Sequence, residues 1–268
     1  MAIDVWAQHP TLRFISHPCF DSLKRWTKIT EVEQELPIDM TAGLMKQAGV
    51  ETALLSAWSS PQGDLISNAE VFEWVKKYPD LFKGLACVNL RQPMNAIDDL
   101  RRAVSEYGFV GLRVVQWLWE MPCTDSLYYP LLAECVHLDI PICLQVGLTG
   151  PLRTSSTGQP AHIEKIALDF PDLKIICGHI GSPWQQEMIA YARKFPNVYI
   201  DTSAYLPKRY PSELIEYMQG RGRSKVLFGT NYPMLQPKAC LEQVDCLGLD
   251  EEAKSMFLTE NAKRIFKL

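Results

Sequence analysis

The chain has 268 residues, of which 47% are apolar, 10% aromatic and 22% charged, a composition typical of a globular protein with a substantial core. A formal net charge of −4 and a pI near 5.8 favour neither nucleic acid nor an acidic membrane surface as a partner. No apolar run approaches the ~20 residues that cross a bilayer, and no signal-type segment precedes residues 3–6, so a soluble, cytoplasmic protein is expected. The eight cysteines include no C-x-x-C pair and are expected to be reduced.

Apolar, β-branched runs alternate with segments of helical periodicity along the chain, as expected for parallel strands buried on both faces. Ser67 and Glu70 form a predicted capping box at the start of one helix, and Pro79 ends that helix. Pro93 begins the next helix, and Gly108 is placed to end it. Strands are predicted at residues 2–6, 51–57, 84–90, 109–115, 141–146, 174–179, 198–203 and 225–230.

This alternation favours a closed barrel over an open doubly wound sheet, which usually has fewer strands and often a glycine-rich turn after its first strand. Residues 7–10 form no such turn. We therefore predict a single (β/α)8 barrel, the TIM barrel, over residues 1–268, a length close to the ~250 residues typical of this fold. The chemistry of such barrels lies at the carboxyl ends of the strands. The longest connection, residues 7–38, is expected to form a lid or a substrate wall.

Arg113 interrupts an otherwise apolar predicted strand and shares its parity with Trp117. A charge inside a barrel is costly unless it meets an anion. One interpretation is a structural ion pair with Asp4 or Asp201. The other is a clamp for a substrate carboxylate or enolate oxygen, which suits the planar guanidinium.

Three further polar residues lie where they can reach the barrel interior or its mouth. Asp4 and Asp201 share parity with other strand residues that face inward, and each is either a catalytic base or a buried salt-bridge partner. His179 ends a buried strand and is either a hydrogen-bonded core histidine or a catalytic acid/base. His9 and His17 lie in the long first connection, where substrate contact is the less favoured interpretation.

Aromatic side chains are expected at or just beyond several strand ends. They either plug the top of the barrel or form the walls of a pocket for a flat or hydrophobic ligand. These residues are Trp6, Trp58, Trp117, Trp119 and Tyr232.

Four stretches resemble the amidohydrolase-related family of (β/α)8 barrels: residues 175–179, 197–203, 228–233 and 260–262. The resemblance extends over essentially the whole chain. In that family the first strand ends in His-x-His or Glu-x-His, the fifth and sixth strands each end in His, and the eighth ends in Asp. These residues bind a metal ion, and the Asp also handles the proton of the attacking water.

The resemblance places Trp6 and Gln8 at the first-strand positions, Gln145 and His179 at the fifth and sixth, and Asn231 at the eighth. A catalytic zinc ion needs about three donors from His, Asp, Glu or Cys. Tryptophan supplies none, and glutamine or asparagine offers only a neutral carbonyl oxygen. We therefore expect no tightly bound metal and no other cofactor, with the amides orienting a ligand without transferring protons.

The resemblance implies hydrolysis or decarboxylation of small, often aromatic acids. The function expected first is metal-independent hydrolysis of a lactone, ester or related carbonyl compound, with His179 as acid/base and Arg113 as clamp. Asp4 or Asp201 would be the base, and Trp6, Gln8, Trp58, Trp117, Gln145, Asn231 and Tyr232 would contact the substrate. The alternatives are a metal-independent decarboxylase, lyase or isomerase acting on an aromatic acid, and a non-catalytic ligand-binding barrel. The expected partner is a small molecule, and homo-oligomerisation is left open.

Overall fold

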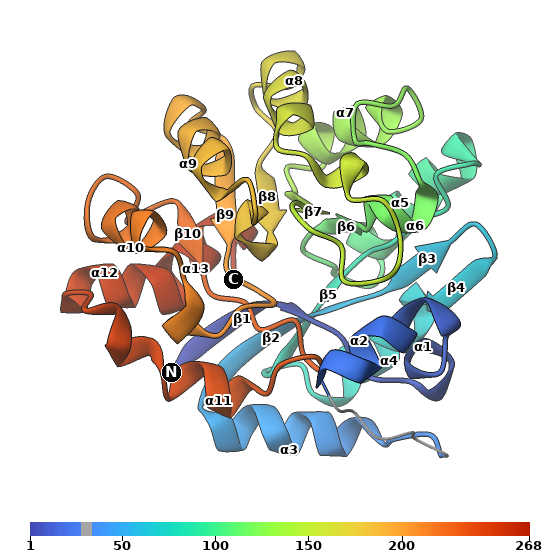
Figure 1. Ribbon diagram of the computed structural model, residues 1–268. Helices are drawn as coiled ribbons and strands as arrows, with labels where there is room; N and C mark the ends of the chain where they lie inside the picture. Colours follow the sequence, from blue (N-terminus) through green and yellow to red (C-terminus); the bar gives the residue numbers. More distant parts are fainter. Residues whose placement is uncertain (28–33) are drawn as a thin grey trace.

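The structure, a computed structural model, describes residues 1–27 and 34–268. Its strands form two parallel sheets, β1–β2–β5 and β6–β7–β8–β9–β10, which join at both edges into a closed ring surrounded by helices (Figure 1). The strands are β1 (Ala2–Ala7), β2 (Val50–Ser56), β5 (Phe82–Leu85), β6 (Leu112–Val114), β7 (Ile142–Gln145), β8 (Ile175–Gly178), β9 (Val198–Asp201) and β10 (Val226–Leu227). This arrangement confirms the predicted (β/α)8 barrel.

Backbone contacts at the two seams close the ring. Parallel bridges join Ala86 to Leu112 and Ala7 to Tyr232. At the second seam, the amide of Asn231 also donates to the carbonyl of Trp6 at 2.7 Å. The seams leave no open sheet edge between β5 and β6 or between β10 and β1, so the strand ends face a common mouth.

Helices follow the strands as in other barrels of this class. They are α1 (Leu12–Ile15), α2 (Asp21–Thr27), α3 (Ile38–Ala48), α4 (Asn68–Lys77), α5 (Pro93–Ser105), α6 (Gln116–Trp119), α7 (Tyr129–His137), α8 (Ala161–Asp169), α9 (Gln185–Lys194), α10 (Ser212–Gln219), α11 (Pro237–Leu241), α12 (Glu251–Ser255) and α13 (Asn261–Phe266). The Ser67–Glu70 capping box at α4 and Pro93 at the start of α5 are both present, as predicted. No described helix is long and apolar enough to cross a membrane.

Several strands are shorter than predicted. The predicted strand 225–230 contracts to β10, and beyond it the amide of Thr230 donates to a carboxylate oxygen of Asp4 rather than to a neighbouring strand. The predicted strand 84–90 overlaps β5 only at residues 84–85, and the predicted strand 109–115 contracts to β6. A hairpin of β3 (Trp58–Ser60) and β4 (Gly63–Ile66) was not predicted; its turn uses Gly63 at a φ of +121°. The prediction of one domain over residues 1–268 stays a prediction.

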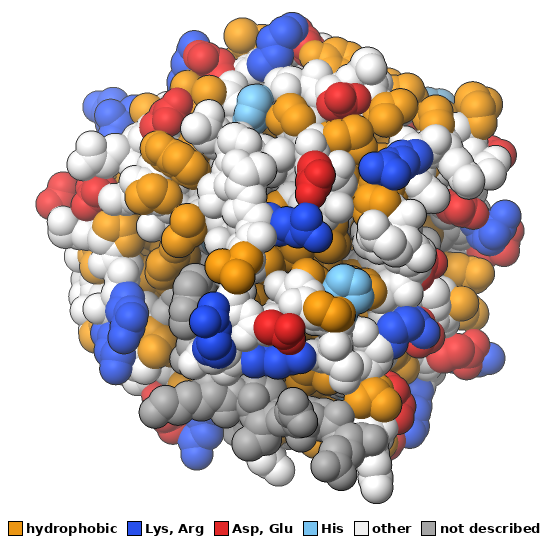
Figure 2. Space-filling model, turned by 45° about the vertical axis from the view of Figure 1, so that its right-hand side comes forward, with side chains coloured by type: hydrophobic (Ala, Val, Ile, Leu, Met, Phe, Trp, Pro, Cys, Tyr) orange, Lys and Arg blue, Asp and Glu red, His pale blue; other side chains and the backbone are white. Residues whose placement is uncertain are grey.

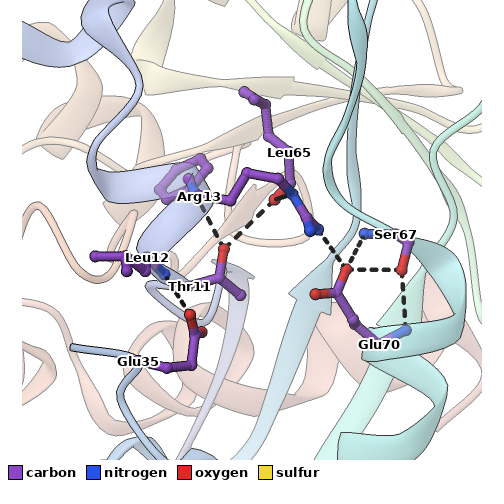
Figure 3. A network of polar contacts seen from close by, with 8 residues as sticks. Thr11, Leu12, Arg13, Glu35, Leu65, Ser67 and Glu70 are labelled. Carbon is purple, nitrogen blue, oxygen red and sulfur yellow. Dashed lines mark hydrogen bonds and ion pairs between the residues drawn. The ribbon is translucent and has the colours of Figure 1, made fainter.

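Thr11 and Arg13 of the long first connection are tied to the β3–β4 hairpin and to α4 (Figure 3). The guanidinium of Arg13 donates to the carbonyl of Leu65 at 3.0 Å and to Glu70 at 2.6 Å, the same glutamate that forms the capping box with Ser67. Thr11 caps α1 by accepting from the amide of Phe14. Of the connection 7–38, which was predicted to form a lid or a substrate wall, residues 28–33 lie outside the described residues.

The surface carries charges of both signs. On the face shown in Figure 2, acidic and basic side chains are interspersed with hydrophobic ones. The cysteines of the described residues are free, and most are buried.

Candidate active site

A cavity of about 350 Å³ opens at the carboxyl ends of the barrel strands. Its lining combines side chains from β1, β6, β7 and the segment after β10 with side chains from the first connection. The residues that the sequence predicted and that line it are Trp6, Gln8, Trp58, Arg113, Trp117, Gln145, His179 and Asn231. The strand ends therefore converge as predicted, and all five positions assigned by the family resemblance meet in this cavity.

Trp6 lines the cavity and is fully buried. Its ring lies against Gly178 at the end of β8, where a Cβ atom would approach the ring to 2.7 Å. The guanidinium carbon of Arg113 lies 3.8 Å from the centroid of the Trp6 ring and 5.2 Å from that of Trp58. The absence of a side chain at Gly178 thus leaves room for the indole of Trp6, and the face of this indole stabilises the guanidinium of Arg113.

Arg113 is buried but forms no ion pair with Asp4, Asp201 or any other described residue within 4.0 Å. Its side chain makes one long hydrogen bond, from Nη1 to the carbonyl of Ala7 at 3.5 Å. Burial lowers its pKa to about 9, which still leaves the guanidinium charged at neutral pH. The predicted ion pair is therefore absent, and the positive charge lies on the cavity wall without a close anion.

Other polar groups of the lining also lack partners within the described part of the chain. The indole nitrogens of Trp6 and Trp58 and Nε of Arg113 are buried donors with no acceptor. Oε1 of Gln8 is a buried acceptor with no donor, and its orientation is fixed because Nε2 donates to both Asn231 and the carbonyl of Tyr232. Buried groups of this kind are costly unless a ligand satisfies them.

His179 lies at the edge of the cavity beside Trp6, with ring centroids 5.1 Å apart. Its Nδ1 is 2.7 Å from the hydroxyl of Ser203. Burial, reinforced by the nearby charge of Arg113, lowers the pKa of His179 to about 3, so the imidazole is neutral at physiological pH. The residue also has a φ of +70°, an uncommon conformation for a non-glycine residue and one often found at functional sites.

The two predicted aspartates do not line the cavity. Asp4 accepts hydrogen bonds from the amides of Trp6 and Thr230 and from the Thr230 hydroxyl, which ties β1 to the segment after β10. Asp201 accepts from the amide and hydroxyl of Ser203. Burial raises the pKa of Asp4 to about 6 and that of Asp201 to about 7. Direct contact of either carboxyl with a ligand in the cavity is therefore not supported, and Asp201 reaches it only through Ser203 and His179.

Three other candidates lie outside the lining. The hydroxyl of Tyr232 is buried against Thr41, and His9 is hydrogen-bonded to Thr41 and the carbonyl of Leu36. His17 caps a short helical turn and contacts Cys19. Each of these side chains has a structural partner in place of the predicted or considered substrate contact.

Sequence reasoning missed part of the cavity wall. Phe14 and Phe20 of the first connection pack on each other at 4.6 Å between ring centroids, and both pack on Trp58. The sequence did not identify these two residues as cavity residues, because an apolar side chain in a loop does not show whether it faces inward. Other unpredicted lining residues include Val115, Leu148, Tyr205, Met234 and Leu235. Ser203, which contacts His179 from outside the lining, was not among the predicted site residues either.

The side chains at the five family positions do not fit a divalent metal ion. Trp6 offers no ligand atom, and Nε2 of Gln8 is hydrogen-bonded to Asn231. The guanidinium of Arg113 already places a positive charge against the Trp6 ring. Within residues 1–27 and 34–268, no three His, Cys, Asp or Glu side chains come together as a metal site. The side chains of the lining that carry a charge or can transfer a proton include Arg113 and His179.

A parallel barrel with polar side chains gathered at its strand ends defines the class of this chain as a TIM-barrel protein. The family model described as amidohydrolase matches residues 38–268, and the chain belongs to that family. The match begins after β1, so Trp6 and Gln8 lie outside it.

Three proteins illustrate what this chain is similar to, and two of them have a named activity. The γ-resorcylate decarboxylases of Rhodococcus jostii and a Polaromonas species are 24% and 26% identical to this chain, over 86% of it and 87% of each relative. An uncharacterised TIM-barrel protein from Bordetella bronchiseptica superimposes with a TM-score of 0.86 at 26% identity, over 99% of this chain and 98% of that one.

The prediction of a hydrolase is wrong. The two named relatives are decarboxylases, which are lyases that break a carbon–carbon bond without adding water across it. The alternative prediction, action on an aromatic acid, agrees with their names. The hydrolase prediction relied on the water chemistry that is common in the wider family, whereas the two relatives act by decarboxylation.

Proposed function

We propose that this protein is a lyase that removes the carboxyl group of a small hydroxylated aromatic acid. The observation that carries the proposal is that residues lining one aromatic-walled cavity include a buried guanidinium without an anion, two buried indole N–H donors without acceptors and one buried amide oxygen without a donor. The names of the relatives give the proposal its reaction.

An aromatic acid supplies what these groups lack. A carboxylate is an acceptor for the guanidinium and the indole N–H groups, and a charge-assisted hydrogen bond is about twice as strong as a neutral one. A ring hydroxyl would donate to Oε1 of Gln8, whose orientation is fixed. The ring itself fits among Trp58, Trp117 and Phe20, whose planes meet edge to face.

The reaction needs the ring carbon that bears the carboxylate to gain a proton. The bond from that carbon to the carboxylate then breaks, CO₂ leaves, and the bonding electron pair restores the aromatic ring. Arg113 holds the acid in one orientation, with the reacting carbon presented to the side of the cavity where His179 lies. Trp6 keeps the guanidinium in place through stacking.

The test is product analysis on a panel of mono- and dihydroxybenzoates with purified protein kept in EDTA. The proposal predicts release of CO₂ and the matching phenol, with deuterium from heavy water on the carbon that lost the carboxylate. Heat-denatured protein is the blank. Ligand binding without loss of CO₂ from any member of the panel would instead identify a non-catalytic binding barrel.

A further inference from the structure

A continuous line of polar groups runs from the cavity into the barrel wall. His179 lines the cavity, and its Nδ1 is 2.7 Å from Oγ of Ser203. Oγ of Ser203 is 3.0 Å from Oδ2 of Asp201, and the amide of Ser203 donates to Oδ1 at 2.7 Å. Ser203 and Asp201 are fully buried, so the line has a single end at the cavity, through the imidazole.

The hydroxyl of Ser203 has one proton, and this couples the other two groups. When Asp201 is ionised, Ser203 donates to it and must accept from Nδ1–H, which leaves a lone pair on Nε2. When Asp201 is protonated, it donates to Ser203, Ser203 donates to Nδ1, and Nε2 carries the proton. No described residue hydrogen-bonds to Nε2, so this atom is free to meet a ligand. Protonation of Asp201 therefore places a proton on Nε2 of His179, and ionisation of Asp201 removes it.

We propose that Asp201, Ser203 and His179 form a proton wire through which a neutral imidazole protonates the bound ligand. The proposal deepens the proposed function and rests on it for the identity of the proton acceptor. In this proposal Asp201 stores the proton without touching the ligand. Ser203 relays the proton to His179, a role that the amino-acid sequence alone did not indicate.

The protons balance in each turnover. Nε2–H of His179 transfers its proton to the ring carbon, Nδ1 takes the proton of Ser203, and Ser203 takes the proton of Asp201. The ring–carboxylate bond breaks, CO₂ leaves with the ring keeping the electron pair, and Asp201 is left ionised. After the product leaves, a proton from water enters at Nε2 and passes back along the same groups to Asp201. His179 changes tautomer and never becomes an imidazolium ion.

This route answers a difficulty in the site. The lowered pKa of His179 prevents it from acting as an imidazolium acid near neutral pH, and Asn231 cannot supply a proton. Asp201 has a raised pKa of about 7, which allows it to store a proton near neutral pH. The charged and titratable groups that surround Asp201 are Asp4, Arg113, Cys143, Cys177 and Tyr210.

The packing around Asp201 holds the carboxyl group close to the backbone of Gly229. A Cβ at Gly229 would lie 2.3 Å from Oδ1 of Asp201, so glycine at this position is required by the carboxyl group. A purely structural role for the same contacts would hold Ser203 in place but would not tie the tautomer of His179 to the protonation of Asp201. This difference makes the two roles separable by experiment.

The experiment is ¹⁵N NMR of the imidazole nitrogens in the ligand-free protein, with the His179→Gln variant used to assign the His179 signals. As the pH rises from about 5 to about 9, through the region where a shifted carboxyl can titrate, the wire predicts that the proton moves from Nε2 to Nδ1. Asp201→Asn, whose amide always donates to Ser203, is expected to keep Nε2 protonated throughout. Ser203→Ala is expected to remove the dependence on pH. A single tautomer at every pH in the wild type, or a wild-type response in Asp201→Asn, would overturn the wire.

Steady-state kinetics provide a second measurement, made with whichever hydroxybenzoate proves to be a substrate. Ser203→Ala is expected to lower kcat by about 10²–10⁴-fold with little change in KM, because a positioned acid is lost while the binding groups remain. The wild-type kcat is expected to fall above the pKa of Asp201. The NMR result does not depend on turnover, so a tautomer change without decarboxylation would reject the proposed function alone. Decarboxylation with an unchanged tautomer would reject the wire alone.

Discussion

At the scale of single residues, the site depends on Arg113 and on what surrounds it. A buried cation usually requires a paired anion, yet Arg113 has an indole face and one long hydrogen bond. Aromatic faces attract cations through their quadrupole, but they do not neutralise the charge. The guanidinium is therefore positioned to bind an anionic ligand. Replacing Arg113 shows whether the residue serves ligand binding or the stability of the fold.

We predict that Arg113→Met weakens ligand binding or turnover by about 10–150-fold, equal to the 1.5–3 kcal/mol of a charge-assisted hydrogen bond. Arg113→Lys should recover only part of the loss, since it keeps the charge without the planar fork. Because no carboxylate is left unpaired, the melting temperature of Arg113→Met is expected to equal or exceed that of the wild type.

The matched control is Arg153→Met. Arg153 is exposed, pairs with Glu120 and does not line the cavity, so kinetics and melting temperature should both stay close to the wild type. A large fall in melting temperature for Arg113→Met, with kcat/KM preserved in the folded fraction, would show that the arginine is structural.

At the scale of elements, the site depends on how closely β8 approaches β1. Gly178 ends β8 with an ordinary φ of −71°, so alanine is allowed by the backbone and only the Trp6 ring opposes it. Left-handed residues then follow three neighbouring strands: His179 after β8, Ala204 after β9 and Asn231 after β10. All three of these residues line the cavity.

Gly178→Ala is therefore predicted to displace the Trp6 indole and, with it, the Arg113 guanidinium. Overpacking of this kind typically costs about 1–3 kcal/mol of unfolding free energy, and binding of an aromatic acid should weaken as well. Gly43→Ala is the matched control, because no atom lies within 4 Å of its added Cβ and alanine favours the interior of α3 by up to about 1 kcal/mol. Chemical unfolding and ligand titration of both variants provide the measurement, and equal behaviour of the two would contradict the proposed packing.

Local sequence patterns were sufficient to predict most helices and strands, but not all the side chains that line the cavity. The capping box at Ser67 and the proline at residue 93 act within one helical turn, so the sequence reveals them directly. The positions of Arg113 and His179 followed from strand order, because parallel strands end at one rim. The aromatic wall from Phe14 depends on a long-range tie between Arg13 and Glu70, which no local pattern encodes. The missing ion pair of Arg113 likewise depends on side-chain distances across the barrel.

At the scale of the whole molecule, buried carboxyl groups link stability to pH. The raised pKa of Asp201 means that the folded state holds its proton more tightly than the unfolded state, whose pKa is near 3.8. Its contribution to the unfolding free energy is therefore complete below about pH 4 and is lost as the pH rises through about 7. His179 acts in the opposite sense, since its lowered pKa makes protonation favour the unfolded state.

Comparison with Asp201→Asn isolates the aspartate, because the contribution of His179 is common to both proteins. Between about pH 4 and 7, the wild type is expected to lose unfolding free energy relative to the variant by up to about 1.4 kcal/mol per pH unit. Above that range the difference should be constant. Urea unfolding at a series of pH values gives the measurement, and parallel pH profiles for the two proteins would show that Asp201 is not protonated in the folded state.

The central claim is that a guanidinium, in place of a metal ion, receives the carboxylate of an aromatic acid in this barrel. Isothermal titration of chelator-treated protein with a hydroxybenzoate and with its neutral amide tests it most directly. We predict that the acid binds more tightly than the amide by about 10–150-fold, that Arg113→Met removes this preference, and that added Mn²⁺ or Zn²⁺ leaves it unchanged. Equal affinity for acid and amide in the wild type, or binding of the acid only after a metal is restored, would contradict the claim.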